Sequence, residues 1–231
     1  MLMRELLVSA SRPRALLLKT LIPLVLTLPL LLGHAPVFWA AMLLTVLAAM
    51  TGAVGSAVTI ARARESGLLT RLALTPRPAW RTAGSWVAGA VAVDSLQLAP
   101  SIVALLVLAP VSPMAAVAIV LSVIATLVVA NVLGCVVSVL GGGPGEVLLD
   151  VVVVLAPLLF LGGLFTGVPP TGWRAVAALV DPFSYVHAAF ITSLGGAASY
   201  DAVAVISAGL ITIAASGMLL AVLARRVLER A

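Results

Sequence analysis

Long apolar runs, separated by short turns that contain proline, glycine or charged residues, follow one another along most of the chain. An apolar run of about 20 residues is long enough to cross the hydrocarbon core of a membrane as a helix. The runs that approach or exceed this length cover 15–32, 37–60, 83–109, 114–140, 147–165 and 202–224. The pattern predicts an all-α integral membrane protein, with one transmembrane domain over 1–231 that contains six transmembrane helices.

Two segments depart from this pattern. Residues 1–14 are short, amphipathic and interrupted by Pro13, which predicts an interfacial helix and elbow on the membrane surface. Between the fifth and sixth runs, Trp173–Val180 and Phe183–Leu194 are each too short to cross a core of about 30 Å. Asp181-Pro182 separates them, so we expect a short re-entrant or surface helical hairpin there.

Composition supports a membrane protein. The chain is 63% hydrophobic and only 9% charged, which is more apolar surface than a soluble domain of 231 residues can bury. The net charge of +5 would suggest nucleic acid in a soluble protein. Here the basic residues flank apolar runs, so membrane topology accounts for them and no nucleic-acid partner is expected. Cys135 is the only cysteine, which excludes an intrachain disulfide and a cysteine-based metal site.

The basic residues also predict an orientation. With six spans, every one of the 13 basic residues except Arg174 falls on the same side of the membrane. Cytosolic loops carry the excess of lysine and arginine, so this side, with both termini, is expected in the cytosol. The protein is therefore expected to be a multi-pass protein of the plasma or inner membrane.

The most charged stretch between two apolar runs is 60–80. Within it, Leu68, Leu69 and Leu72 recur at helical spacing, with Ala73 beside them, and predict one apolar stripe. Arg64, Thr70, Arg71 and Thr75 are then expected to face water or a partner, and Pro76 and Pro78 end the helix. Two interpretations remain: an ordinary cytosolic loop, or a short helix that transmits motion from a soluble motor.

Here the residues resemble a known family. Glu65, Gly67, Leu69, Arg71, Leu72, Thr75 and Pro76 match the pattern before the third span in the permeases of type-2 ABC exporters. Leu68 stands where threonine is usual, and Thr70 where an acidic residue is usual. A second region is similar to the family's fifth span and return loop, through Pro157–Phe165, Pro169-Pro170, Trp173, and Asp181-Pro182 followed by Phe183, Ser184 and Tyr185. There Gly162 replaces a usual serine and Asp181 a usual asparagine.

The resemblance implies the membrane subunit of an exporter for a hydrophobic or amphipathic small molecule, such as a drug, an antibiotic or a lipid-like compound. Two permease chains, as a homodimer or heterodimer in membrane lipid, would work with two cytosolic ABC ATPase subunits that bind ATP and Mg. The segment 60–80 would be the coupling segment. Its expected contact residues are Arg64, Glu65, Gly67, Leu68, Leu69, Arg71 and Leu72. The return loop would include Trp173, Asp181, Pro182 and Tyr185.

The chain lacks a phosphate-binding loop of its own. Its glycine-rich stretch Gly141–Gly145 is followed by Glu146 rather than by Gly-Lys-Ser/Thr. We therefore expect no cofactor and no enzymatic activity on this chain, with ATP hydrolysis on a partner.

A few polar residues lie inside the predicted spans. Asp94, Gln97 and Asn131 are candidates for a transport pathway, because ionisable and polar groups at membrane depth are costly. The alternatives are hydrogen bonds between helices and, for Asp94, a cap at a kink or a span that begins later. His34 and His187 are assigned to the outer side with a surface or capping role, and no metal cluster accompanies them.

Two other functions remain open. The chain could be a membrane assembly or scaffold protein without a transport cycle. Less favoured is a membrane-embedded lipid-modifying enzyme, for which Asp94 would be required without any ATPase.

Overall fold

The fold was analysed in a computed structural model that describes residues 13–74, 76–109, 111–168, 171–197 and 202–229. Regular structure in these ranges is helical throughout. The helices are α2 (Pro13–Leu32), α3 (Val37–Glu65), α4 (Leu68–Ala73), α5 (Ala79–Leu108), α6 (Pro113–Val137), the 3-10 turn η1 (Ser138–Leu140), α7 (Pro144–Leu161), α8 (Trp173–Val180), α9 (Pro182–Ser193) and α10 (Ala202–Glu229). The predicted elbow over 1–14 falls almost entirely outside the described residues.

Five of these helices, α3, α5, α6 with η1, α7 and α10, are long and apolar enough to cross a membrane. The pair α8 and α9 would add a sixth span if counted as one broken helix, although the two are bent by 86° at Asp181. The all-helical fold is therefore confirmed for the described residues, and five or six helices that could cross a membrane agree with a multi-pass protein. The apolar part of α2, Leu16–Leu32, is shorter than the other spans, so the predicted span at 15–32 is not among the five.

Several helix ends differ from the predicted span ends. Helix α3 continues to Glu65 rather than ending near residue 60, and α5 begins at Ala79 rather than near residue 83. Arg62 and Arg64 lie in the last turn of α3, where cations stabilise the helix dipole, so charge does not end the helix. At about 1.5 Å per residue, helices of 29 and 30 residues are longer than a core of about 30 Å, so their ends extend beyond it.

Prolines explain where several helices begin. Pro113 and Pro144 occupy the first turns of α6 and α7, where their missing N–H would be unpaired anyway. Ser112 also caps α6 by accepting a hydrogen bond from the Ala115 backbone N–H at 3.2 Å. Because Pro144 starts the helix, α7 begins at residue 144 rather than at the predicted 147. It also ends earlier than predicted, at residue 161 rather than 165.

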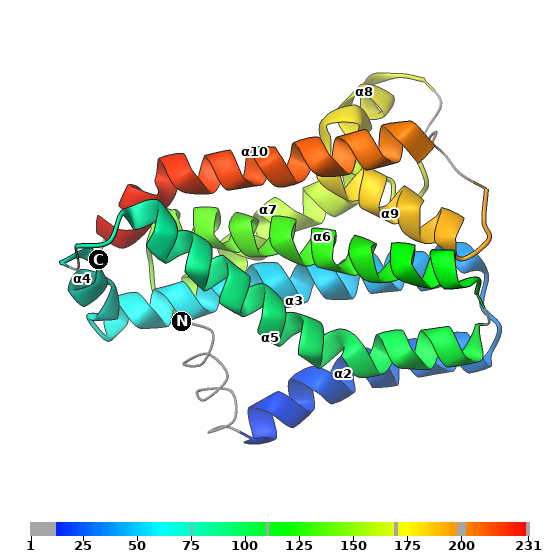
Figure 1. The fold of residues 1–231 in the computed structure, drawn as a ribbon, viewed down its shortest axis with the longest axis horizontal. Coiled ribbons are helices and arrows are strands. Elements are labelled where there is room, and N and C mark those ends of the chain that lie inside the picture. The colour runs from blue at the N-terminus through cyan, green and yellow to red at the C-terminus, as the bar shows by residue number, and fades with distance from the viewer. Residues whose placement is uncertain (1–12, 75, 110, 169–170, 198–201, 230–231) are drawn as a thin grey trace.

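Helices α3 and α6 form the centre of the bundle and make its most extensive contact. Small buried residues line α3 there, including Ala49, Gly52 and Ala53. A Cβ atom on Gly134 of α6 would overlap the carbonyl oxygen of Ala53, so only glycine permits this approach. Helices α5, α7, α9 and α10 pack around this pair, and α2 packs mainly on α5 (Figure 1).

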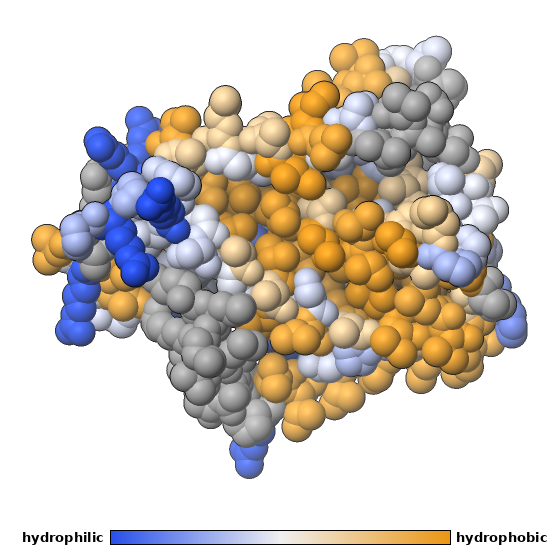
Figure 2. All heavy atoms as spheres, viewed as in Figure 1, coloured by the Kyte–Doolittle hydropathy of each residue, from blue (hydrophilic) through white to orange (hydrophobic). Residues whose placement is uncertain are grey.

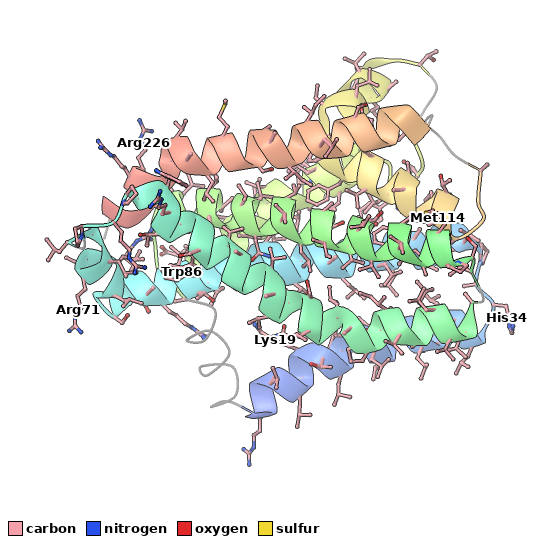
Figure 3. The ribbon with its side chains drawn as sticks, in the orientation of Figure 1. Lys19, His34, Arg71, Trp86, Met114 and Arg226 are labelled. Atoms are coloured by element: carbon pink, nitrogen blue, oxygen red, sulfur yellow. The ribbon has the colours of Figure 1, made fainter. Side chains whose placement is uncertain are left out.

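The bundle has two chemically different ends, with apolar side chains over much of the face between them (Figure 2). One end, which we call the arginine end, carries α4 and the adjoining ends of α3, α5 and α10, with Arg62, Arg64, Arg71, Arg77, Arg81, Arg225 and Arg226. The other, the hairpin end, carries α8, α9, His34 and Met114 (Figures 1 and 3). Lys19 lies away from the arginine end, beside α5 (Figure 3).

Candidate functional site

The predicted coupling segment forms a separate short helix at the arginine end. Gly67 adopts a left-handed conformation (φ +66°), which ends α3 and lets α4 start in a new direction. Leu69 of α4 is fully buried and packs in a cluster with Ala63 of α3 and Val227 of α10. Leu68 and Leu72 pack partly buried against the same cluster. The apolar stripe is therefore confirmed for the three leucines, and it fixes α4 to the bundle. Ala73, which was predicted beside them, is exposed instead.

The opposite face of α4 is exposed. Thr70 and Arg71 are exposed, and Leu74, the residue after α4, is 82% exposed. Arg77 continues this exposed surface, while Thr75 lies outside the described residues. Figure 3 shows Arg71 pointing away from the bundle at its extremity. Leu74 was not singled out from the sequence, because its exposure depends on how α4 sits on α3 and α10.

Arg64 was predicted to face water or a partner, but its side chain lies against η1 instead. Its Nη2 donates a hydrogen bond of 2.6 Å to the Ser138 carbonyl oxygen of η1. Its Nε and Nη1 atoms are buried without a hydrogen-bond partner in the described part of the chain. Arg64 therefore ties the end of α3 to η1, because the long helix places this side chain against its neighbour. Glu65, the next residue, is exposed.

Asp94 and Asn131 lie together between three helices. The Asn131 Nδ2 donates to Asp94 Oδ2 at 3.0 Å and to the Leu127 carbonyl oxygen of its own helix at 2.9 Å. The Ser56 hydroxyl of α3 donates to Asn131 Oδ1, so α3, α5 and α6 share one polar network. All three side chains are buried. The sequence did not predict the role of Ser56.

Asp94 lies in the middle of α5, which begins at residue 79. Gln97 and Ser101 are buried on the same face of this helix, and Gln97 Oε1 and Ser101 Oγ have no hydrogen-bond partner within the described ranges. The structure thus brings Asp94 and Asn131 into contact and places Gln97 beside them.

The predicted hairpin forms as two helices that meet at Asp181. Its Oδ1 accepts a hydrogen bond of 2.9 Å from the Phe183 backbone N–H, and Pro182 takes the first position of α9. The Ser184 hydroxyl donates to the Ala178 carbonyl oxygen at 2.5 Å, and the Tyr185 hydroxyl to that of Leu179 at 2.8 Å. These bonds close the corner between α8 and α9. Trp173, at the start of α8, is 70% exposed.

The two histidines occupy different environments. His34 lies in the turn between α2 and α3, where it has a positive φ of 50°. It is exposed, in agreement with the predicted surface role. The surface role predicted for His187 is wrong, because α9 packs into the bundle and buries this residue to 4% exposure. Its ring lies edge-on to Phe38 of α3, with ring centroids 5.4 Å apart. The described residues contain no group of acidic, histidine or cysteine side chains suited to a metal ion.

Comparison of the chain with protein-family models, with curated proteins and with solved structures gave no match.

Proposed function

We propose that this chain is the membrane subunit of an ATP-driven exporter of the type-2 ABC class, and that α4 is the helix through which a separate ATPase moves it. The observation that carries the proposal is the two-sided character of α4. Its inner face is fixed by the buried Leu69, and its outer face presents Thr70, Arg71 and Leu74. A helix of this kind can transmit a push from a soluble partner to the bundle that holds it.

The attachment of α4 supports this role. Because α4 contacts both α3 and α10, a displacement of α4 would act on two long helices at once. Arg64 connects the last turn of α3, just before α4, to η1 at the end of α6. A plain connecting loop between α3 and α5 would need none of these contacts.

The exposed face of α4 is suited to a protein partner. Leu74 is 82% exposed beyond Arg71, which gives an apolar side chain next to a cation. Arginine and large apolar groups are typical of the few residues that dominate binding energy at interfaces. The charge of the surrounding arginine end would favour an acidic groove on the partner.

In this proposal six crossings place both termini in the cytosol, with α2 as the first crossing and the α8–α9 hairpin returning to the side it enters from. The arginine end then lies in the cytosol by the positive-inside rule. Two such chains would assemble with two ATPase subunits, which supply ATP and Mg. The cargo would be a hydrophobic or amphipathic small molecule, because the described helices present apolar surfaces to the bilayer and to one another.

The test is ATP-dependent transport into inside-out vesicles that contain the chain and an ABC ATPase from the same genome, with a panel of fluorescent hydrophobic compounds. Arg71→Glu combined with Leu74→Asp should lower transport about tenfold or more, since losing one dominant interface residue costs at least about 2 kcal/mol. Neither side chain is buried, so the amount of folded chain in the membrane should stay constant.

Arg226→Glu is the matched control, because it reverses one exposed charge at the same end but on α10. Its effect should be much smaller than that of the α4 variant. Unchanged transport in the α4 variant would refute the coupling role of α4. A chain that binds no ATPase and moves no compound would instead favour the membrane scaffold.

A further inference from the structure

Helix α8 exposes a face that is entirely apolar except for an indole nitrogen. This face carries Trp173, Val176, Leu179 and Val180, which are between 57% and 83% exposed. Trp173, Val176 and Val180 recur at helical spacing, so they form one stripe along the helix. Four large apolar side chains on so short a helix are costly to leave in water, and the stripe therefore requires an apolar surrounding.

The one charged residue of α8, Arg174, lies on the inner side of the helix. Its Cζ lies 4.7 Å from the ring centroid of Phe160 in α7, and its Nη2 donates to the Thr166 hydroxyl at 2.7 Å. Ala178, one turn further along the same side, is fully buried. A helix that meets water turns its charged face outward and its apolar face inward. Helix α8 does the reverse, which is the pattern of a helix that meets lipid.

The place of α8 in the fold brings its apolar stripe next to the surface of a membrane-crossing helix. The main contacts of α8 are with α7 and α9, and Figure 1 shows it at the hairpin end, outside the group of long helices. Phe160, which Arg174 contacts, is exposed in the last turn of α7, and Val153 is exposed further along that helix. Because α7 is long and apolar enough to cross, its exposed residues meet acyl chains, and α8 adjoins this surface.

The geometry of α8 excludes a crossing of its own. At about 1.5 Å per residue its eight residues extend about 12 Å, and it is bent by 86° from α9. We propose that α8 lies in the plane of the membrane, in the headgroup layer at the hairpin end, with its apolar stripe inserted toward the acyl chains of phospholipids. Helices of this kind insert by about 5–10 Å, and tryptophan is enriched at this depth, which suits Trp173.

The size of the stripe favours lipid over a protein partner. A stable protein interface takes about 20–30 residues from each side, whereas α8 offers four large side chains. Lipid requires no such area, because acyl chains cover any apolar surface that reaches them. This proposal does not depend on an ATPase or on transport.

The measurement is the membrane depth of nitroxide labels on the full chain in phospholipid vesicles. Trp173→Cys, Val176→Cys and Val180→Cys are labelled one at a time, while the native Cys135 is buried. Collision rates with oxygen, which enters the acyl region, and with a water-soluble nickel chelate give the depth. Positions 173 and 180 are about 10 Å apart along the helix. We nevertheless expect the three labels at one depth below the headgroups, to within about 3 Å or two residue rises.

Helix α10 provides the matched control. Leu210 and Met218 are exposed to a similar extent, and they lie in a helix that is long and apolar enough to cross. Because eight residues separate them by about 12 Å along α10, a label at 218 should lie deeper than one at 210. None of the five labelled positions is buried, so the labels should leave the fold intact.

Three results would overturn the proposal. A depth that changes by about 10 Å between positions 173 and 180 would show that α8 points into or out of the membrane. Strong collision with the nickel chelate at 176 and 180 would place the stripe in water. Weak collision with both reagents at these positions would show that protein covers the stripe, and a second copy or another chain would then replace lipid as its partner.

Discussion

Asn131 is the residue at which three helices meet. Its side chain accepts from Ser56 of α3 and donates to Asp94 of α5, while it also donates to the backbone of its own helix α6. Inside a membrane such bonds replace the ordinary hydrophobic drive, which is absent between apolar helices in lipid. The sequence showed that Asp94 and Asn131 were polar residues in spans. It could not show that the two side chains touch, because they are 37 positions apart in the sequence and their contact depends on how α5 and α6 pack.

The same limit explains the error at His187. The polarity of this residue suggested a surface, but its exposure is set by which face of α9 packs on α3 and α6. Periodicity alone could not decide this, since both faces of a short apolar helix in lipid are apolar. The signal that was present, a spacing of i, i+4 and i+7 with Phe183 and Phe190, becomes informative only once the packing is known.

The polar network makes a prediction about stability. Asn131→Leu keeps the approximate volume but leaves the Asp94 carboxylate and the Ser56 hydroxyl without their partner, which should lower the free energy of unfolding by about 1–3 kcal/mol. Adding Asp94→Leu should restore part of this loss, because removing both partners costs less than removing one. The measurement is unfolding by SDS titration in mixed micelles.

Thr126→Val is the matched control. Thr126 is equally buried, but its hydroxyl donates only to the Ser122 carbonyl oxygen of its own helix. If Asn131→Leu costs no more than Thr126→Val, and the double variant recovers nothing, the network contributes no more than an ordinary intrahelical bond.

At the scale of elements, the hairpin was the segment predicted most closely. Its first half was predicted as Trp173–Val180 and is α8 without change, and the second half differs from α9 by one residue at each end. Asp181-Pro182 carries local signals, a capping side chain followed by proline at the first helical position, and local signals are readable in a sequence. The ends of α3 and α5 were less predictable, since charge marks where a span leaves the membrane and not where its helix ends.

The close contact of α3 and α6 makes a second prediction. Gly134→Ala should destabilise the protein by about 1–3 kcal/mol, because the new methyl group would overlap the Ala53 carbonyl oxygen and force the two helices apart. Gly84→Ala on α5 is the control: a Cβ atom there meets nothing within 4 Å. Alanine favours a helix over glycine, so Gly84→Ala should be neutral or stabilising. Equal effects of the two substitutions in the same SDS titration would mean that α3 and α6 do not approach as closely as described.

For the whole molecule, a series of long apolar helices could be predicted from the sequence, although the predicted span at 15–32 is not among the five that are long enough to cross. The arrangement of the helices around α3 and α6 could not be predicted. The runs of hydrophobic residues establish a multi-pass protein, in agreement with the five or six helices that are long enough to cross. The neighbours of each helix depend on small residues such as Gly52 and Gly134, whose packing partners lie far away in the sequence. The clustering of arginines at one end then gives the bundle its polarity (Figure 2).

That polarity can be measured with thiol labelling. Cys135 is the sole cysteine and is buried, so single cysteines at Leu74 and Trp173 report on the two ends with little background. A membrane-impermeant maleimide should label Trp173→Cys in intact cells and Leu74→Cys only in inside-out vesicles. The unsubstituted chain should remain unlabelled in both. Labelling of both positions from one side would show that α4 and the hairpin lie on the same side of the membrane. This result would contradict the proposed orientation, in which α4 is cytosolic and the hairpin is on the opposite side.

The central claim is that α4 touches an ATPase, and the most direct measurement is site-specific photocrosslinking in cells that produce both chains. A photoreactive phenylalanine replaces Leu74 beside α4, and replaces Val176 of α8 as the control, since both side chains are highly exposed. The account predicts a crosslink to the ATPase from position 74 and none from position 176. The absence of a crosslink from position 74, with the ATPase present and both chains in the membrane fraction, would contradict it.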